Sequence, residues 1–191
     1  MMRIITGSAR GAKLQAPAGE NTRPTAERTK EAIFSMLQGR FEGRRVLDLF
    51  AGSGQMGLEA VSRGATHALL LDHDKNAVAD INQNAKHTKL SDKVEVRTGE
   101  ALAFLKTYCG APFSLIFLDP PYRLGLLPDC LALIAERGLL TEGGVVICES
   151  GDGKVFADKT ELATRYRVDR ESRYGAAFVT ILSLNEQGSD A

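Results

Sequence analysis

The four residues Asp119-Pro120-Pro121-Tyr122 have the types and spacing needed to methylate an amino group on a planar ring. Such an amine is a poor nucleophile because its lone pair is delocalised into the ring. The Asp119 carboxylate can accept one N–H and the Pro120 carbonyl the other, which aims the lone pair and stabilises charge developing on nitrogen. The prolines restrict φ, and Tyr122 offers a face for base stacking. The motif predicts amino-group methylation without distinguishing adenine, cytosine, guanine or a glutamine amide, and a stiff turn is the alternative.

A glycine-rich segment, Gly52 to Gly57, matches Gly-x-Gly-x-x-Gly, and Asp72 follows twenty residues after Gly52. This pattern indicates a nucleoside ligand that approaches the backbone at Gly52 and Gly54. Asp48 argues against NAD, because a carboxylate would repel a pyrophosphate close by. A ligand with an ammonium and a sulfonium would be attracted, which favours S-adenosylmethionine. Residues 48–54 resemble the first motif of methyltransferases that use this cofactor, although a plain strand-to-helix turn is the alternative.

Three further residues complete the predicted cofactor site. Asp72 ends a strand and would bind the ribose hydroxyls, unless it is merely a polar strand end. Glu100 stands where such methyltransferases hold the adenine amino group, with the Ala101 amide near a ring nitrogen. An exposed glutamate at a helix start is the alternative for Glu100. Nearby Asp74 is better interpreted as a helix cap.

Short apolar runs alternate with helical patterns from Arg45 onward, which predicts alternating strands and helices. The strands are expected at 45–50, 67–72, 93–97, 113–118 and 144–149, and the intervening helices end near residues 63, 87, 108 and 137. Such alternation implies an α/β fold, a mainly parallel sheet with helices on both faces. The motifs then lie at the carboxyl edge of the sheet, where such sheets bind ligands.

Both ends of the chain depart from this alternation. The runs at 166–171 and 177–184 are separated by only a few residues, which forces a terminal antiparallel hairpin. Near the amino terminus, residues 3–6 and 13–15 are expected to form a small hairpin, followed by a helix from Thr25 to about Leu37. We therefore divide the chain into a basic extension (1–45), a core (46–184) and a polar tail (185–191).

The 191 residues, 43% hydrophobic and 25% charged, fit one globular domain and exclude collagen-like, disordered and disulfide-framework classes. Neither an apolar run of about 18 residues nor a signal-peptide core is found, so a cytoplasmic protein is expected. The three cysteines lie far apart, which predicts no metal site, and each is expected to be a buried apolar residue.

The charge distribution is uneven although the net charge is zero. Residues 1–45 hold nine Lys/Arg and four acids, an excess of +5. Such asymmetry is typical of an arm that meets a polyanion such as RNA. On charge alone, a solvated basic face is the preferred interpretation.

Nearly all of residues 2–184 resembles the RsmD family of bacterial small-subunit ribosomal RNA guanine-N2 methyltransferases. The matching segments are residues 3–7, 10–14, 23–31, 48–54, 57–60, 119–122 and 125–127. The first three are specific to this family, whereas the glycine loop is shared by methyltransferases at large. The resemblance implies a Rossmann-like, class I S-adenosylmethionine-dependent methyltransferase core with a terminal antiparallel strand and a small RNA-contacting extension. It also implies that the target guanine lies in 16S ribosomal RNA of the small subunit or its assembly intermediate.

By matching position, five residues would line the RNA approach: Arg10, Lys13, Arg23, Thr25 and Arg28. For Thr25, a helix N-cap is about as well supported as a substrate contact. Two positions depart from many relatives, which have phenylalanine at the place of Tyr122 and glutamate at that of Asp72. The first change keeps the stacking face, and the second gives a shorter reach to the ribose.

Three other functions compete with this reading. A DNA adenine or cytosine amino-methyltransferase also uses Asp-Pro-Pro-Tyr, but 191 residues leave no room for a sequence-reading domain beyond the 45-residue extension. An NAD-dependent oxidoreductase fits the glycine pattern but is opposed by Asp48. A non-catalytic RNA-binding relative is opposed by the intact motif at residues 119–122.

Overall fold

The computed structural model describes residues 2–15 and 24–185, without the side chains of residues 24–27. A seven-stranded sheet has the order β3-β2-β1-β4-β5-β7-β6. The strands are β1 (Arg45–Asp48), β2 (His67–Asp72), β3 (Val94–Thr98), β4 (Phe113–Leu118), β5 (Leu140–Ser150), β6 (Tyr166–Tyr174) and β7 (Ala177–Leu184). The α-helices are α1 (Pro24–Met36), α2 (Gln55–Ser62), α3 (Lys75–His87), α4 (Ala101–Thr107), α5 (Leu127–Glu136) and α6 (Thr160–Thr164). The predicted α/β class is confirmed.

The sheet is parallel through β5 and antiparallel at its end. Each of β1 to β4 pairs in parallel with its neighbours, and β4 pairs in parallel with β5. The central strand β4 is buried at all six positions, as expected for a strand covered on both faces. The predicted terminal hairpin is confirmed, and β7 inserts between β5 and β6. Length and hydrophobicity alone did not predict which of the two hairpin strands pairs with β5.

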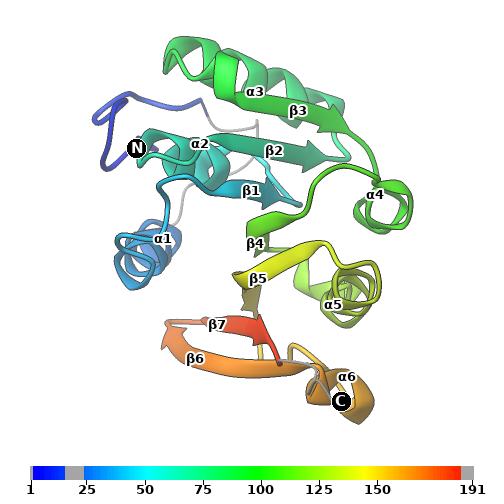
Figure 1. Ribbon diagram of the computed structural model, residues 1–191. Coiled ribbons are helices and arrows are strands. Elements are labelled where there is room, and N and C mark those ends of the chain that lie inside the picture. Colours follow the sequence, from blue (N-terminus) through cyan, green and yellow to red (C-terminus); the bar gives the residue numbers. More distant parts are fainter. Residues whose placement is uncertain (1, 16–23, 186–191) are drawn as a thin grey trace.

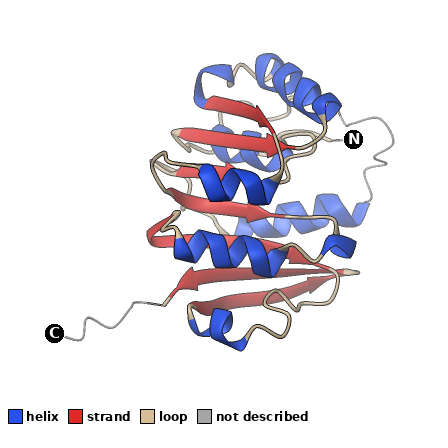
Figure 2. Cartoon of the chain, turned by 90° about the vertical axis from the view of Figure 1, so that its right-hand side faces the viewer, coloured by secondary structure: helices blue, strands red, loops and turns tan. Residues whose placement is uncertain are grey.

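Helices cover both faces of the sheet, and Figure 1 shows α1 on one side of the strands and α4 and α5 on the other. On one face, Phe34 of α1, Leu58 of α2 and Ile81 of α3 share a hydrophobic cluster. On the other, α4, α5 and α6 contribute to a second cluster, and Figure 2 views this face with its helices in front of the strands. Within the described residues, no helix is long and apolar enough to cross a bilayer.

The amino-terminal hairpin forms, but as a single antiparallel bridge between Arg3 and Lys13 rather than as two strands. Its inner side chains, Met2, Ile4 and Leu14, are buried in the same cluster as α1 and α2. The basic extension therefore shares its hydrophobic core with the rest of the chain. A division at residue 45 can only be one of charge and role.

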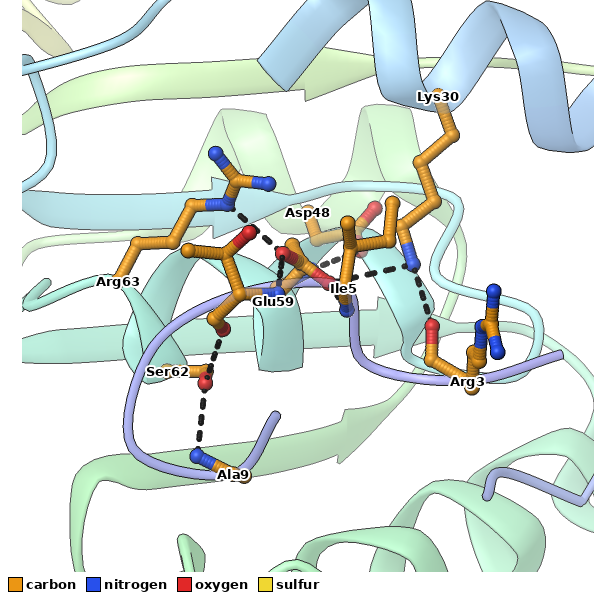
Figure 3. Close-up of polar contacts among 10 residues, drawn as sticks. Arg3, Ile5, Ala9, Lys30, Asp48, Glu59, Ser62 and Arg63 are labelled. Atoms are coloured by element: carbon orange, nitrogen blue, oxygen red, sulfur yellow. Dashed lines mark hydrogen bonds and ion pairs between the residues drawn. The ribbon is translucent and has the colours of Figure 1, made fainter. Parts of the chain in front are cut away.

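A buried carboxylate, Glu59 of α2, holds the extension in place (Figure 3). It accepts hydrogen bonds from the backbone N–H groups of Ile5 and Thr6, at 2.7 and 3.0 Å. The guanidinium of Arg63 donates to it at 2.7 Å, and the Lys30 ammonium lies 3.5 Å away. Lys30 is therefore a buried structural cation. Its charge, counted in the excess of the extension, does not face a polyanion.

Candidate active site

The predicted site residues gather at the carboxyl edge of the sheet. Asp48 and Asp72 end β1 and β2, while Asp119 directly follows β4. The strands β1, β2 and β4 are neighbours, and β5 lies beside β4 with Cys148 in register with Leu118. Because neighbouring parallel strands lie about 4.8 Å apart, these strand ends form one continuous row.

The three glycines of the segment from Gly52 to Gly57, which joins β1 to the first turn of α2, have different roles. Gly52 and Gly54 have φ of 53° and 76°, a region that favours glycine. A Cβ on Gly57 would stand 2.8 Å from the Leu70 side chain, so this glycine lets α2 pack closely on β2. A Cβ on Gly52 would meet nothing within 4 Å. The space beside Gly52 is open, and a ligand can lie against the backbone there.

Asp72 holds this loop. Its Oδ2 accepts a hydrogen bond from Gly52 N at 2.8 Å, and its Oδ1 accepts one from Asp74 N at 2.9 Å. Each carboxylate oxygen has two acceptor positions, so capacity for a ligand hydroxyl remains. The strand-end role and the predicted ribose role are therefore compatible. The predicted cap is also present, because the Asp74 side chain accepts from Asn76 N at the start of α3.

Asp48 is a buried carboxylate with an unusual environment. Only 3% of the residue is exposed, and Oδ2 accepts a hydrogen bond from Gly57 N at 3.0 Å. Burial raises the pKa of this carboxyl from 3.8 to about 7, although the Gly57 bond opposes the shift and the charge of Asp72 adds to it. A buried anion with little compensation favours a nearby cation. The ionised form of Asp48 would repel a pyrophosphate placed beside it.

Glu100 and Ala101 stand at the start of α4, directly beyond β3. Glu100 is the N-cap residue, with an exposed side chain that makes no capping hydrogen bond. Ala101 is buried as the first residue of the helix, where backbone N–H groups have no intrahelical acceptor. The exposed carboxylate and the helix start are therefore at the sheet edge, as predicted.

The chemical motif leaves β4 as a turn into a short 3-10 helix at Tyr122–Leu124. Asp119 is exposed and Pro120 is buried. Tyr122 is half-exposed, and its hydroxyl donates to Glu149 Oε1 at 2.9 Å. A Cβ on Gly151 would stand 2.8 Å from the Tyr122 ring, so the ring lies against the backbone after β5. The aromatic face predicted for stacking is thus held in a defined orientation.

Three of the five residues predicted to contact RNA have described side chains. Arg10, Lys13 and Arg28 are exposed. The turn that carries Arg10 is tied to the end of α2, because Ser8 N and Ala9 N donate to the backbone and side chain of Ser62. Arg10 therefore lies at the far end of α2 from the glycine loop. Arg23 and the side chain of Thr25 lie outside the described residues.

The sequence analysis did not predict a role for two side chains near the site, Glu149 and Asn84. Glu149 was noted only as a strand end, although the β4–β5 register places it one residue beyond the pair formed by Leu118 and Cys148. Asn84 of α3 is buried, and its amide bonds the backbone of Gln15 in both directions and donates to Ser53 O at 2.9 Å. It links the extension to the glycine loop. A polar residue on an otherwise apolar helix face was the available signal.

Among the described residues, no group of three or more histidine, cysteine, aspartate or glutamate side chains could hold a metal ion. Cys130 and Cys148 are buried as expected. Burial raises the pKa of the Cys130 thiol to about 12, so it is an inert apolar group. Cys109 is exposed, which corrects the expectation of burial, because it follows the end of α4 in a surface loop.

Known proteins are similar to this chain in sequence and in fold. The family model described as Conserved hypothetical protein 95 matches residues 2–183. Ribosomal RNA small subunit methyltransferase D of Escherichia coli is 36% identical over 191 residues, covering 100% of this chain and 94% of the relative. YlbH of Bacillus subtilis, provisionally named an rRNA methyltransferase, is 42% identical over 150 residues, 78% of this chain and 82% of the relative.

A solved structure agrees with these relatives. The structure of yhhF from Escherichia coli, provisionally described as a methyltransferase, superposes with a TM-score of 0.84 at 31% identity. The match covers 97% of this chain and 99% of the other. The chain thus belongs to the Conserved hypothetical protein 95 family, the RsmD family of methyltransferases whose motifs its sequence carries.

Proposed function

We propose that this methyltransferase moves the methyl group of S-adenosylmethionine to the exocyclic N2 amine of a guanine in 16S ribosomal RNA. The observation that carries the proposal is the placement of Asp119 and Pro120 directly after β4, beside the strand ends of Asp48 and Asp72. The names of the relatives, which refer to rRNA and to the small subunit, support the substrate class. The N2 target rests on the family resemblance.

The described residues fit this cofactor. The open space beside Gly52 and its positive φ leave room for a ligand along the loop. Asp48 would accept the ammonium, and Asp72 would accept the ribose hydroxyls while it holds Gly52. Glu100 would accept the adenine amino group, and the Ala101 N–H would donate to a ring nitrogen. When bound, the cofactor supplies a methyl group on a sulfonium sulfur.

The residues after β4 would act on the target amine. Asp119 would accept one N–H and the Pro120 carbonyl the other, so that the nitrogen lone pair points at the methyl group. Tyr122 would hold the base by stacking. Transfer would be direct, with the sulfonium sulfur leaving as a neutral thioether and the amine proton going afterwards to water or Asp119. A paired guanine offers its N2 amine to cytosine, so the target must be unpaired or extruded.

The exposed basic residues of the extension would bind RNA phosphates. Arg10, by its distance from the glycine loop, would contact phosphates remote from the methylated base. Lys30 is excluded because it is buried beside Glu59. RNA affinity should therefore fall steeply with salt, and Arg10→Ala with Lys13→Ala should reduce the slope by roughly one to two units. Binding of the cofactor should be the same in this variant. We expect the enzyme to act in the cytoplasm, on the small subunit or its precursor.

The test is methyl incorporation from labelled S-adenosylmethionine into small-subunit particles, naked 16S RNA, an RNA duplex and DNA, followed by nucleoside mass mapping. N2-methylguanosine should appear in particles and be scarce in the duplex. Asp119→Ala should slow transfer by about 100-fold or more with cofactor affinity little changed. Methylated adenine or cytosine in DNA would instead establish the runner-up DNA methyltransferase. Calorimetric titration with NAD, expected to show no binding, addresses the oxidoreductase alternative.

A further inference from the structure

A second carboxylate lies beside the motif that follows β4. Glu149 is the penultimate residue of β5, and the register places Cys148 opposite Leu118. Glu149 is the next residue of β5 and Asp119 is the residue that directly follows β4, so both carboxyl groups belong to one stretch of the sheet edge. The two charges also act on the same phenol, since both raise the pKa of Tyr122, in addition to its burial.

The Glu149 carboxylate accepts a hydrogen bond from Tyr122 and keeps further acceptor capacity. Its Oε1 accepts the Tyr122 hydroxyl at 2.9 Å, while no residue that the structure describes donates a hydrogen bond to its Oε2. The side chain is half-buried, and burial raises the pKa of its carboxyl whereas the Tyr122 bond lowers it. A partly desolvated acceptor with spare lone pairs is suited to a ligand that brings its own donor.

Guanine carries such a donor beside the amine that is methylated. Its N1–H is adjacent to the N2 amine on the same edge of the base, whereas adenine and cytosine have an unprotonated ring nitrogen next to their amines. We infer that Glu149 is a specificity-determining residue that accepts the guanine N1–H while Asp119 accepts the N2 amine. This inference rests on the proposed function and deepens it. A base with a ring-nitrogen lone pair at that position would face the carboxylate and be repelled.

The discriminating probe is 2,6-diaminopurine, which keeps the 2-amino group of guanine but presents an N1 acceptor. Small-subunit particles are reconstituted from 16S transcripts that carry either guanine or 2,6-diaminopurine at the mapped target. The parent enzyme should methylate guanine faster by about 100-fold or more, because a site built for a donor rejects an analogue that lacks it. Glu149→Gln, whose amide can donate or accept, should narrow that ratio to within about tenfold.

Tyr122→Phe is the matched control, because it removes the Tyr122–Glu149 hydrogen bond and keeps the carboxylate. If Glu149 only positioned Tyr122, both variants would lower kcat alike and leave the guanine-to-diaminopurine ratio unchanged. We expect Tyr122→Phe to retain the ratio of the parent, and Glu149→Asp to retain part of it. Thermal unfolding of each variant establishes that it is folded.

The outcomes separate the two hypotheses. Parent enzyme that leaves guanine unmethylated in every particle contradicts the proposed function itself. Parent enzyme that methylates guanine and diaminopurine equally, or a ratio untouched by Glu149→Gln, overturns the inference about Glu149 while leaving guanine methylation in place.

Discussion

Glu59 of α2 and Asp48 at the end of β1 are both buried carboxylates, and their surroundings differ. Glu59 faces the extension, where two backbone N–H groups, a guanidinium and an ammonium surround it. Asp48 faces the glycine loop, where Gly57 N donates to it and burial raises its pKa to about 7. A buried charge costs free energy unless it is paired. The charge of Glu59 is compensated by groups of the protein itself and stabilises the fold. The charge of Asp48 would be compensated by a bound cationic ligand.

The largest effect is expected from Glu59→Gln. This change keeps the shape but leaves the Lys30 ammonium buried beside a neutral amide, so unfolding free energy should fall by about 3–5 kcal/mol. Urea denaturation measures the change. In the double variant Lys30→Met with Glu59→Gln, the stranded charge is absent, and part of the stability should return. A single variant as stable as the parent would show that this ion pair contributes little.

Asp48→Asn tests the other side of the comparison. Asparagine can still accept from Gly57 N but carries no charge, so the folded protein should be no less stable at pH 8 than the parent. Cofactor affinity should fall, since a charge-assisted hydrogen bond contributes about 1.5–3 kcal/mol, or about 10- to 150-fold in Kd. Calorimetric titration with S-adenosylmethionine gives the affinity. Loss of stability without loss of affinity would assign Asp48 the structural role that we give to Glu59.

The pH dependence of Asp48 sharpens the same distinction. Its folded pKa of about 7 exceeds the unfolded value of 3.8, so it favours the folded state below pH 4 and this contribution is lost as pH rises towards 7. Cofactor binding has the opposite sign, because the ammonium needs the ionised form. Affinity should rise about tenfold per pH unit up to pH 7, with release of a proton. Titrations in two buffers of different ionisation enthalpy measure that proton, and Asp48→Asn should show none.

The sequence predicted the site where signals were local. Buried apolar runs located the strands, and a polar residue ending such a run marks the carboxyl edge, which is why Asp48, Asp72 and Asp119 could be named together. The glycine loop carried its own signal in its spacing. The helix cap at Asp74 was equally local, because its acceptor lies two residues before the donor.

The missed features depend on contacts between distant segments. Lys30 was counted as part of a basic surface because its burial against Glu59 follows only from the packing of α1 and the extension on α2. Glu149 became relevant only through the register of β5 on β4, and Asn84 through its bonds to Gln15 and Ser53. Such pairings need three-dimensional placement that a periodic pattern does not contain.

The smallest expected effect comes from Asn84, which links the extension to the glycine loop. Asn84→Ala leaves the backbone groups of Gln15 and Ser53 without this partner, which should lower stability by about 1–3 kcal/mol. Ser62→Ala is the matched control. It releases the extension at the opposite end of α2, where the hydroxyl accepts from Ala9 N and donates to Thr6 O.

Both variants should therefore lower the unfolding free energy, but only Asn84→Ala should change the affinity for the cofactor. Ser53 belongs to the glycine loop, so Asn84→Ala loosens the backbone between Gly52 and Gly54 and should weaken S-adenosylmethionine binding several-fold. Ser62 touches no part of that loop, and its variant should bind the cofactor like the parent. The two affinities are measured by calorimetry under conditions where each variant is more than nine-tenths folded. Equal affinities in both variants would mean that the extension is attached to α2 without any connection to the cofactor side.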